Sequence, residues 1–407
     1  MPQSSPTPES TAIPELRAAL ALALIFFLRM LGLFLLLPVF ALAAQDLEGS
    51  TPMLIGVAIG GYGLTQALLQ IPFGTLSDRY GRKPTITAGL LIFMAGSAIA
   101  ACSSSIAGVI AGRALQGAGA ISAAVMALAA DLTGERSRTL AMALIGMSIG
   151  AAFAAAFVFG PMVHHAAGLS GMFWTSGALA LAALVVLHRL VPDPPRSPHH
   201  DDCEAEPAQL RQVLADPGLL QLDFGIFCLQ MILTATFVAV PLALRDEAGL
   251  AAARHWQVYL PVLVASLLLI LPWLRRADRG AGSRRPFLAF IGLIATAELG
   301  LWLGHDSLPV LIAVLLLFFT AFNFLEANLP ALVSRAAPPM QRGTALGVYS
   351  TSQFLGTFLG GVAGGWLYGH LRYAGVFLFG ATVAALWLWT VHRGTRQDRR
   401  RAGRFFD

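Results

Sequence analysis

Long apolar runs alternate with short polar stretches along almost the whole of this 407-residue chain. Each run has about 20 residues, and a helix of that length, rising about 1.5 Å per residue, crosses about 30 Å of hydrocarbon. The pattern therefore predicts an all-α membrane protein with twelve transmembrane helices. Their expected ranges are 16–44, 53–77, 84–102, 106–132, 139–163, 170–191, 218–245, 254–276, 286–304, 308–334, 342–370 and 373–393.

The longest internal polar stretch lies between the sixth and seventh segments. It contains six prolines and a cluster of acidic residues, which is typical of a flexible linker. Two parallel six-helix halves are a transporter arrangement, with the binding site at their interface near the midplane of the membrane. We therefore expect an N-terminal tail, a first bundle, a linker, a second bundle and a basic tail, at residues 1–15, 16–191, 192–217, 218–393 and 394–407.

Composition and charge support a membrane protein and fix its expected orientation. Only 12% of the residues are charged, against about 25% in soluble domains. Of the 27 lysines and arginines, 22 fall on the predicted side that both termini share, and 3 fall on the other. Because cytoplasmic loops carry the excess of basic residues, the termini and the linker are expected in the cytoplasm. This asymmetry explains the net charge of +5 without nucleic acid.

The charged loop between the second and third segments reads GTLSDRYGRKP, from Gly74 to Pro84. Gly74 and Gly81 let backbones approach closely. Asp78 stands where a helix ends, so it can cap a neighbouring helix or pair with a cation, and Arg82 has the planar fork that suits a carboxylate. We interpret the loop as a latch whose contacts form in one conformation and break in another. The alternative is that its three cations only set the topology.

Two arginines lie inside the predicted membrane segments, where a charge costs at least about 2.5–3.5 kcal/mol. Arg29 lies midway along the first segment, and Arg113 lies in the fourth, one turn before Gln116. One interpretation is a cavity cation that attracts substrate or tunes a nearby acid. The other is a packing arginine satisfied by backbone carbonyls. We place Arg29, Arg113 and Gln116 in the expected substrate cavity.

Two acids, Glu298 and Glu326, also lie within membrane segments. Burial disfavours the charged form of a carboxylate, so such an acid can exchange a proton in a useful pH range. Glu326 is the better candidate because Asn323 shares its helix face, and both are assigned to the cavity. The expected proton-coupling residues are Glu326, Glu298 and Arg113. The alternative is a glutamate locked to a helical neighbour.

Other polar residues within the segments either line the cavity or bond one helix to another. They are Gln66, Gln70, Gln230, Thr234, Tyr349 and Gln353. Asp223 lies too near the expected membrane surface to assign. In the linker, His199 to Glu204 have no spacing of a defined metal site, so no metal is expected. No nucleophile–base set or nucleotide-binding loop is present, so we expect neither an enzyme nor an ATP-driven pump.

Several stretches resemble signatures of the major facilitator superfamily. The loop at 74–84 resembles the signature between helices two and three, and GRALQGAGA at 112–120 resembles that of the fourth helix. GPMV at 160–163 resembles the end of the fifth-helix antiporter signature, although His164 and His165 replace the usual tandem glycines. The likeness is closer to the YajR-type bacterial inner-membrane transporters and covers about residues 20–393. The stretches that carry it are 29–39, 62–84, 112–133, 322–330 and 347–356.

The resemblance implies roles for the loop. The residue matching Asp78 caps the start of helix eleven in the outward-open state, here Gly343 and Thr344, and the residue matching Arg82 pairs with Asp131. This network would latch the two halves together and release during alternating access. YajR-type transporters also carry a cytosolic domain after the last helix. The chain ends at Asp407, so we expect no such domain and none of its regulation.

Together these features predict a secondary transporter with the major facilitator fold. We expect proton-coupled efflux of small amphipathic molecules by a monomer in the lipid bilayer. A proton gradient would supply the energy, and no cofactor is expected. Uptake or facilitated transport of a metabolite is a second hypothesis. A sensor or scaffold that resembles a transporter but carries no flux is a third.

Overall fold

The computed structural model describes residues 8–193, 207–278, 284–338 and 341–397, and within these ranges it contains helices and no β-strand. Two short 3₁₀ helices, Ala44–Asp46 and Ala252–Arg254, accompany the α-helices. The α-helices are α1 Pro8–Phe34, α2 Phe40–Ala43, α3 Pro52–Tyr80, α4 Arg82–Cys102, α5 Ile106–Ala118, α6 Ser122–Asp131, α7 Glu135–Leu190, α8 Pro207–Ala215, α9 Pro217–Asp246, α10 Trp256–Asp278, α11 Arg284–Gly304, α12 Leu308–Ala336 and α13 Arg342–Gln397.

Ten stretches in the described part of the chain are long and apolar enough to cross a membrane. Two of them belong to α7 and α13, which have 56 residues each, about 84 Å if straight, and so can each cross twice. Each is interrupted by one residue with positive φ, Gly168 at 66° and Arg372 at 55°. The predicted all-α fold with twelve transmembrane helices is confirmed.

The first predicted segment, 16–44, is wrong as one continuous helix, because α1 ends at Phe34. Pro38 explains the break: it has no N–H to donate, and its ring clashes with the carbonyl of the residue four positions earlier. The chain turns tightly, with Leu37 donating to the Phe34 carbonyl at 2.9 Å, and continues as α2.

The fourth predicted segment, 106–132, is also broken, into α5 and α6. The break lies at Gly119, whose ψ of 55° is not helical. A side chain there would overlap the Gly89 carbonyl, so glycine lets the fourth crossing lie directly against α4. The Gly119 carbonyl leaves the helical pattern and accepts a hydrogen bond from Arg29 at 3.0 Å.

The predicted linker, 192–217, is not wholly irregular, because it contains the helix α8. Its sequence PAQLRQVLA is rich in good helix formers, and Val213 is buried. The Gln341 side chain donates to Gln212 and so joins α8 to the start of α13. The cluster from His199 to Glu204 lies outside the described residues.

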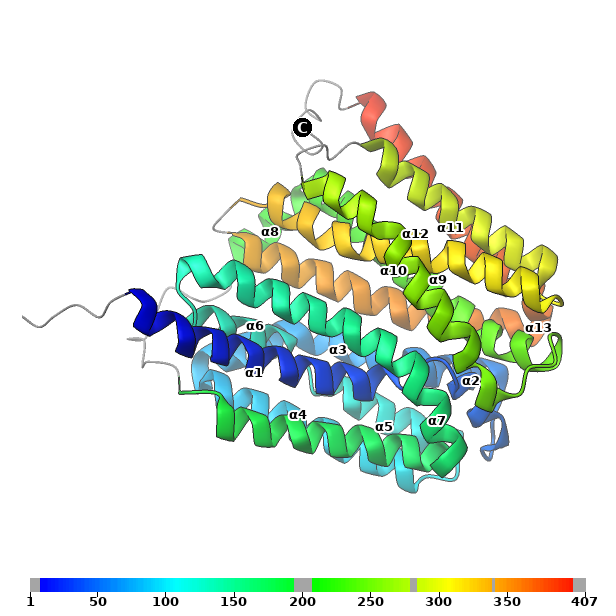
Figure 1. Cartoon of the computed structure of the whole chain (residues 1–407), viewed down its shortest axis with the longest axis horizontal. Coiled ribbons are helices and arrows are strands. Elements are labelled where there is room, and N and C mark those ends of the chain that lie inside the picture. The colour runs from blue at the N-terminus through cyan, green and yellow to red at the C-terminus, as the bar shows by residue number, and fades with distance from the viewer. Residues whose placement is uncertain (1–7, 194–206, 279–283, 339–340, 398–407) are drawn as a thin grey trace, which may run out of the picture.

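The helices form two groups, α1–α7 in the lower part of Figure 1 and α9–α13 in the upper part. We call the end of the molecule where α1 begins the terminal side, and the opposite end the far side. The groups meet where α3 packs against α13. A Cβ on Gly56 would overlap the Gly361 carbonyl, and one on Gly60 would lie 2.8 Å from the Phe358 carbonyl. Glycine thus permits close contact between the two halves.

Aromatic rings add a second contact between the halves. Phe153 of α7 stacks on Phe322 of α12 with ring centroids 5.9 Å apart, and Phe157 meets Phe237 and Tyr259 edge-on at 5.1 Å each. Such edge-on and offset pairs stabilise a contact beyond the apolar area that they bury.

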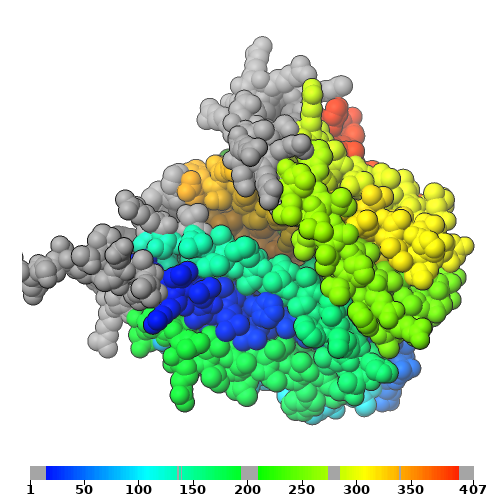
Figure 2. All heavy atoms as spheres, in the orientation of Figure 1, coloured from blue at the N-terminus to red at the C-terminus, as the bar shows by residue number. Residues whose placement is uncertain are grey.

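Polar contacts between the halves also lie on the far side, where Arg245 donates to the Gln45 side chain at 3.0 Å. On the terminal side, the ion pairs of Arg82 and Lys83 stay within the N-terminal half. Figure 2 shows orange atoms of the C-terminal half set back between the teal atoms of α7 and the lime atoms of α10. The structure is therefore joined on the far side.

Candidate functional site

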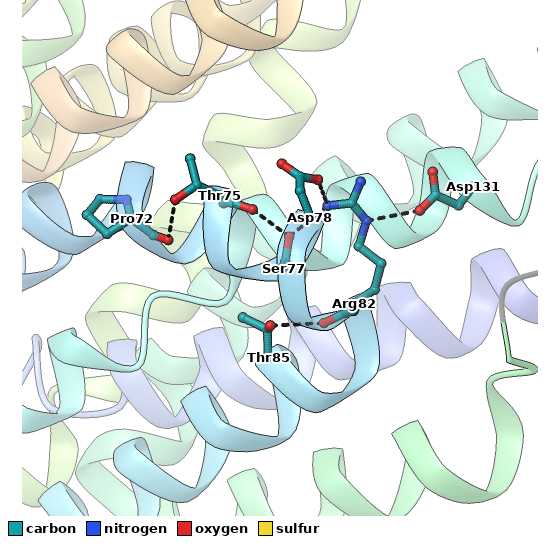
Figure 3. Close-up of polar contacts among 9 residues, drawn as sticks. Pro72, Thr75, Ser77, Asp78, Arg82, Thr85 and Asp131 are labelled. Atoms are coloured by element: carbon teal, nitrogen blue, oxygen red, sulfur yellow. Dashed lines mark hydrogen bonds and ion pairs between the residues drawn. The ribbon is translucent and has the colours of Figure 1, made fainter. Parts of the chain in front are cut away.

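Arg82 forms the centre of a polar network at the loop between α3 and α4 (Figure 3). Its Nε donates to Asp131 at 3.0 Å, and its Nη1 donates to the Ser77 hydroxyl at 2.7 Å and to Asp78. Gly81 makes the turn with a φ of 98°, a conformation that favours glycine. The loop therefore places the Arg82 guanidinium in contact with acids of α3 and α6.

The whole network lies within the N-terminal half. Asp78, Arg82 and Asp131 meet, but in the described part of the chain Asp78 has no hydrogen bond to Thr344 at the start of α13. Gly74 has room for a Cβ, which would lie 3.7 Å from Ala123. The cap on α13 therefore stays a prediction for another conformation.

Lys83 makes a contact that the sequence analysis did not identify. Its Nζ donates to the Val191 carbonyl and contacts Asp193, both at 2.7 Å, so the loop is tied to the end of α7. The Lys83 ammonium lowers the pKa of the exposed Asp193 carboxyl. No local pattern in the sequence pairs two residues so far apart.

A small cavity of about 30 Å³ lies between the two halves. Its walls are mostly leucine and phenylalanine side chains, with five polar residues among them. A mainly apolar cavity with a few converging polar groups is the usual form of a small-molecule site. The lining residues are Leu33, Phe34, Leu36, Leu37, Phe40, Ile59, Tyr62, Arg113, Gln230, Leu233, Thr234 and Thr357.

Arg113 lines this pocket, and its guanidinium is held firmly from behind. It donates to the carbonyls of Ala58 and Ile59 and to the Gln116 side chain, each at 3.1 Å, and it lies 4.5 Å from the Tyr62 ring centroid. The two interpretations of this arginine are therefore compatible: backbone carbonyls satisfy it, and it faces the cavity.

Arg29 and Gln116 lie in the core of the N-terminal half and do not line the pocket. Arg29 is 1% exposed and donates from Nη2 to Gln66 and to the Gly119 carbonyl, both at 3.0 Å. Its Nε and Nη1 have no partner. Gln116 donates to Ser97 at 2.8 Å.

Glu326 is joined to the pocket through Gln230. The carboxylate accepts from the side-chain amides of Gln230 at 3.0 Å and Gln353 at 2.9 Å, which come from α9 and α13. Gln230 itself lines the pocket. Asn323 does not join Glu326, because it donates to Ser266 of α10 at 3.0 Å. The Glu326 carboxylate is thus bonded by glutamines from neighbouring helices and not, as the alternative had it, by a neighbour on its own helix.

Glu298 lies apart from the pocket, in the core of the C-terminal half. It is fully buried and accepts from the Thr236 hydroxyl at 2.7 Å, whereas its second oxygen has no partner. Among the described residues, no group of three or more histidine, cysteine, aspartate or glutamate side chains is arranged to hold a metal ion.

Asp223 is a residue that sequence reasoning missed. The sequence suggested a surface position, but Asp223 is 5% exposed and neither of its carboxylate oxygens has a partner. One signal could have found it: it lies seven residues before Gln230, and residues at that spacing share a helix face.

Comparison with known proteins identifies the family of the chain. The family model described as Major Facilitator Superfamily matches residues 22–264 and 222–405. The chain belongs to the major facilitator superfamily. It is 48% identical to the inner membrane transport protein YajR of Escherichia coli over 374 residues, which cover 92% of this chain and 82% of that protein. It is also 26% identical to the multidrug resistance protein MdtH of Aeromonas hydrophila, over 87% of this chain and 88% of the relative.

Solved structures show the same major facilitator fold. A human organic anion transporter has a TM-score of 0.71 at 21% identity, covering 92% of this chain and 99% of the other. A D-xylose–proton symporter has a TM-score of 0.70 at 16% identity, covering 93% and 97%. The chain is thus a multi-pass membrane transporter of the major facilitator superfamily.

Proposed function

We propose that the protein exports small amphipathic molecules and that protons entering through Glu326 drive the export. The observation that carries this proposal is the contact between Glu326 and Gln230, which places an acid of a transmembrane helix one side chain away from the pocket. A proton that moves down the membrane potential supplies about 2.3 kcal/mol per 100 mV. The name of the MdtH relatives, multidrug resistance proteins, supports export of varied compounds.

The proposed mechanism is alternating access in a bacterial inner membrane, with both termini in the cytoplasm. The halves would rock about the pocket, and the contacts of Arg82 with Asp78 and Asp131 would change as they do so. The close far-side contact between α3 and α13 supports this mechanism, because two halves that touch near one end can rock about that contact. The terminal side, which would face the cytoplasm, would then be the open side in this conformation.

The experiment that tests the proposal measures proton movement into liposomes that contain the purified protein and a pH-sensitive dye. Hydrophobic cations, neutral drugs and common metabolites are each added under an imposed proton gradient. We expect at least one compound to trigger proton movement in the wild-type protein. Glu326→Gln should abolish this movement, because the amide has a similar shape but cannot exchange a proton.

The matched control is Asp306→Asn, which neutralises an exposed acid between α11 and α12 and should leave the proton movement intact. Full proton movement in folded Glu326→Gln protein would contradict the role of Glu326. Silence of the wild-type protein with every compound would favour facilitated transport or a sensor without flux.

A further inference from the structure

Four polar side chains of the C-terminal half lie at increasing distances along their helices from the helix ends on the terminal side. Asp223 lies about 9 Å along α9 from its first residue, and Tyr349 lies about 10 Å along α13 from its first residue. Glu326 lies about 15 Å from the end of α12 on the same side, and Gln230 lies about 20 Å along α9. Gln230 lines the pocket, so the series extends from the terminal side to the pocket.

The two outer members of this series are buried and have no hydrogen-bond partner among the residues that the structure describes. Neither oxygen of Asp223 is bonded, and the same holds for the Tyr349 hydroxyl, which belongs to a residue only 5% exposed. Buried polar atoms are nearly always paired, so these three require an explanation. Atoms of this kind are positions where water molecules bind inside proteins.

The helix register links the same residues. Tyr349 lies four residues before Gln353 on α13, and Asp223 lies seven residues before Gln230 on α9. Neutral amides from α9 and α13 bond the Glu326 carboxylate itself. Asp223 and Tyr349 therefore share helix faces with the two glutamines that bond Glu326.

We propose that Asp223 and Tyr349 form the route by which protons pass between the terminal side and Glu326. This inference rests on the proposed function of Glu326. A hydroxyl both donates and accepts, so Tyr349 can take a proton from the acid form of Asp223 while giving its own to the Glu326 carboxylate. Asp223 is left as the carboxylate, Glu326 becomes the acid and Tyr349 is unchanged. Because no direct hydrogen bond joins the three, water or a rotation of the tyrosine completes the route.

A pH jump followed by infrared spectroscopy tests the route without a transported compound. The carbonyl band of a protonated carboxyl group disappears on deprotonation, and Asp223→Asn and Glu326→Gln assign the bands of the two acids. In the detergent-purified full chain, Asp223→Asn and Tyr349→Phe should each slow the change of the Glu326 band at least about tenfold. A tenfold change in rate corresponds to about 1.4 kcal/mol in the barrier.

The matched control is Tyr259→Phe, because Tyr259 is another buried tyrosine of this half whose hydroxyl has no partner. It should leave the rate at Glu326 unchanged, and thermal midpoints equal to wild type would exclude misfolding of the variants. A wild-type rate in both Asp223→Asn and Tyr349→Phe would overturn the route alone. A Glu326 band that does not change between about pH 5 and about pH 9 would overturn the route and the proposed function together.

Discussion

The N-terminal half buries two arginines, Arg29 and Arg113, whereas the C-terminal half buries two acids, Asp223 and Glu298, and holds a third, Glu326, partly buried. Carbonyl and glutamine oxygens hold the arginines, and no acid of the described residues forms an ion pair with them. The acids accept only from neutral amide or hydroxyl groups or have no donor at all. The basic groups inside the membrane segments therefore lie in one half, and the acidic groups inside them lie in the other.

This difference matters because the two kinds of group respond differently to protons. A guanidinium stays charged at any pH that a cell experiences, so the interior charge of the N-terminal half is fixed. A carboxyl group in apolar surroundings can change its charge by taking up or releasing one proton. The comparison indicates a fixed N-terminal half and a C-terminal half whose charge can vary. Substitutions at both kinds of group can test it.

The largest effect on stability is expected from Arg113→Met. The substitution leaves the buried Gln116 oxygen without its donor and removes the contacts with two carbonyls of α3. Each buried group left unpaired costs about 1–3 kcal/mol, so the free energy of unfolding in detergent should fall by at least about 2 kcal/mol. Arg113→Lys is the control, because it keeps the positive charge but not the forked guanidinium. Its free energy of unfolding should lie between those of the wild type and Arg113→Met. Unchanged stability in Arg113→Met would show that these contacts do not hold the N-terminal half.

A smaller effect is expected from Arg82→Ala at the surface of the same half. Its partners Asp78 and Asp131 have side chains that are 36% and 40% exposed, so water can replace the lost contacts. Exposed ion pairs contribute about 0–1 kcal/mol, and stability should fall by less than about 1 kcal/mol. If the network is a latch, transport by the folded variant should nevertheless slow. A normal transport rate would contradict the latch and would favour the alternative, in which the charges of this loop only set the orientation of the helices in the membrane.

The sequence was sufficient for the parts of the fold that depend on length and hydropathy. Twelve segments long enough to span a membrane are visible without any tertiary information. Where the helices break was harder to predict, because Gly119 looks like any other helix-packing glycine until its carbonyl meets Arg29. Pro38 did carry a local signal for the end of α1, and the apolar run around it concealed that signal.

The candidate site was only partly predictable for the same reason. The pairing of Arg82 with Asp131 came from a resemblance, and it is present. The partners of Glu326 came from α9 and α13, about 100 and 30 residues away along the chain, and nothing local could select them over Asn323. Burial of Asp223 depends on how α9 packs, which hydropathy does not determine.

The smallest effect is expected from Glu298→Gln in the C-terminal half. This acid has one bond, from Thr236, and an isolated buried carboxyl group is stable when it is neutral. The glutamine oxygen can keep that bond, and its amide replaces one unpartnered polar group by another. The free energy of unfolding should therefore change by no more than about 0.5 kcal/mol, in contrast to Arg113→Met. Glu298→Ala is the control, because it removes the acceptor and leaves a cavity, and should cost about 2 kcal/mol or more. A large loss of stability in Glu298→Gln would mean that the Glu298 carboxyl group is charged. The C-terminal half would then hold a fixed buried charge, as the N-terminal half does.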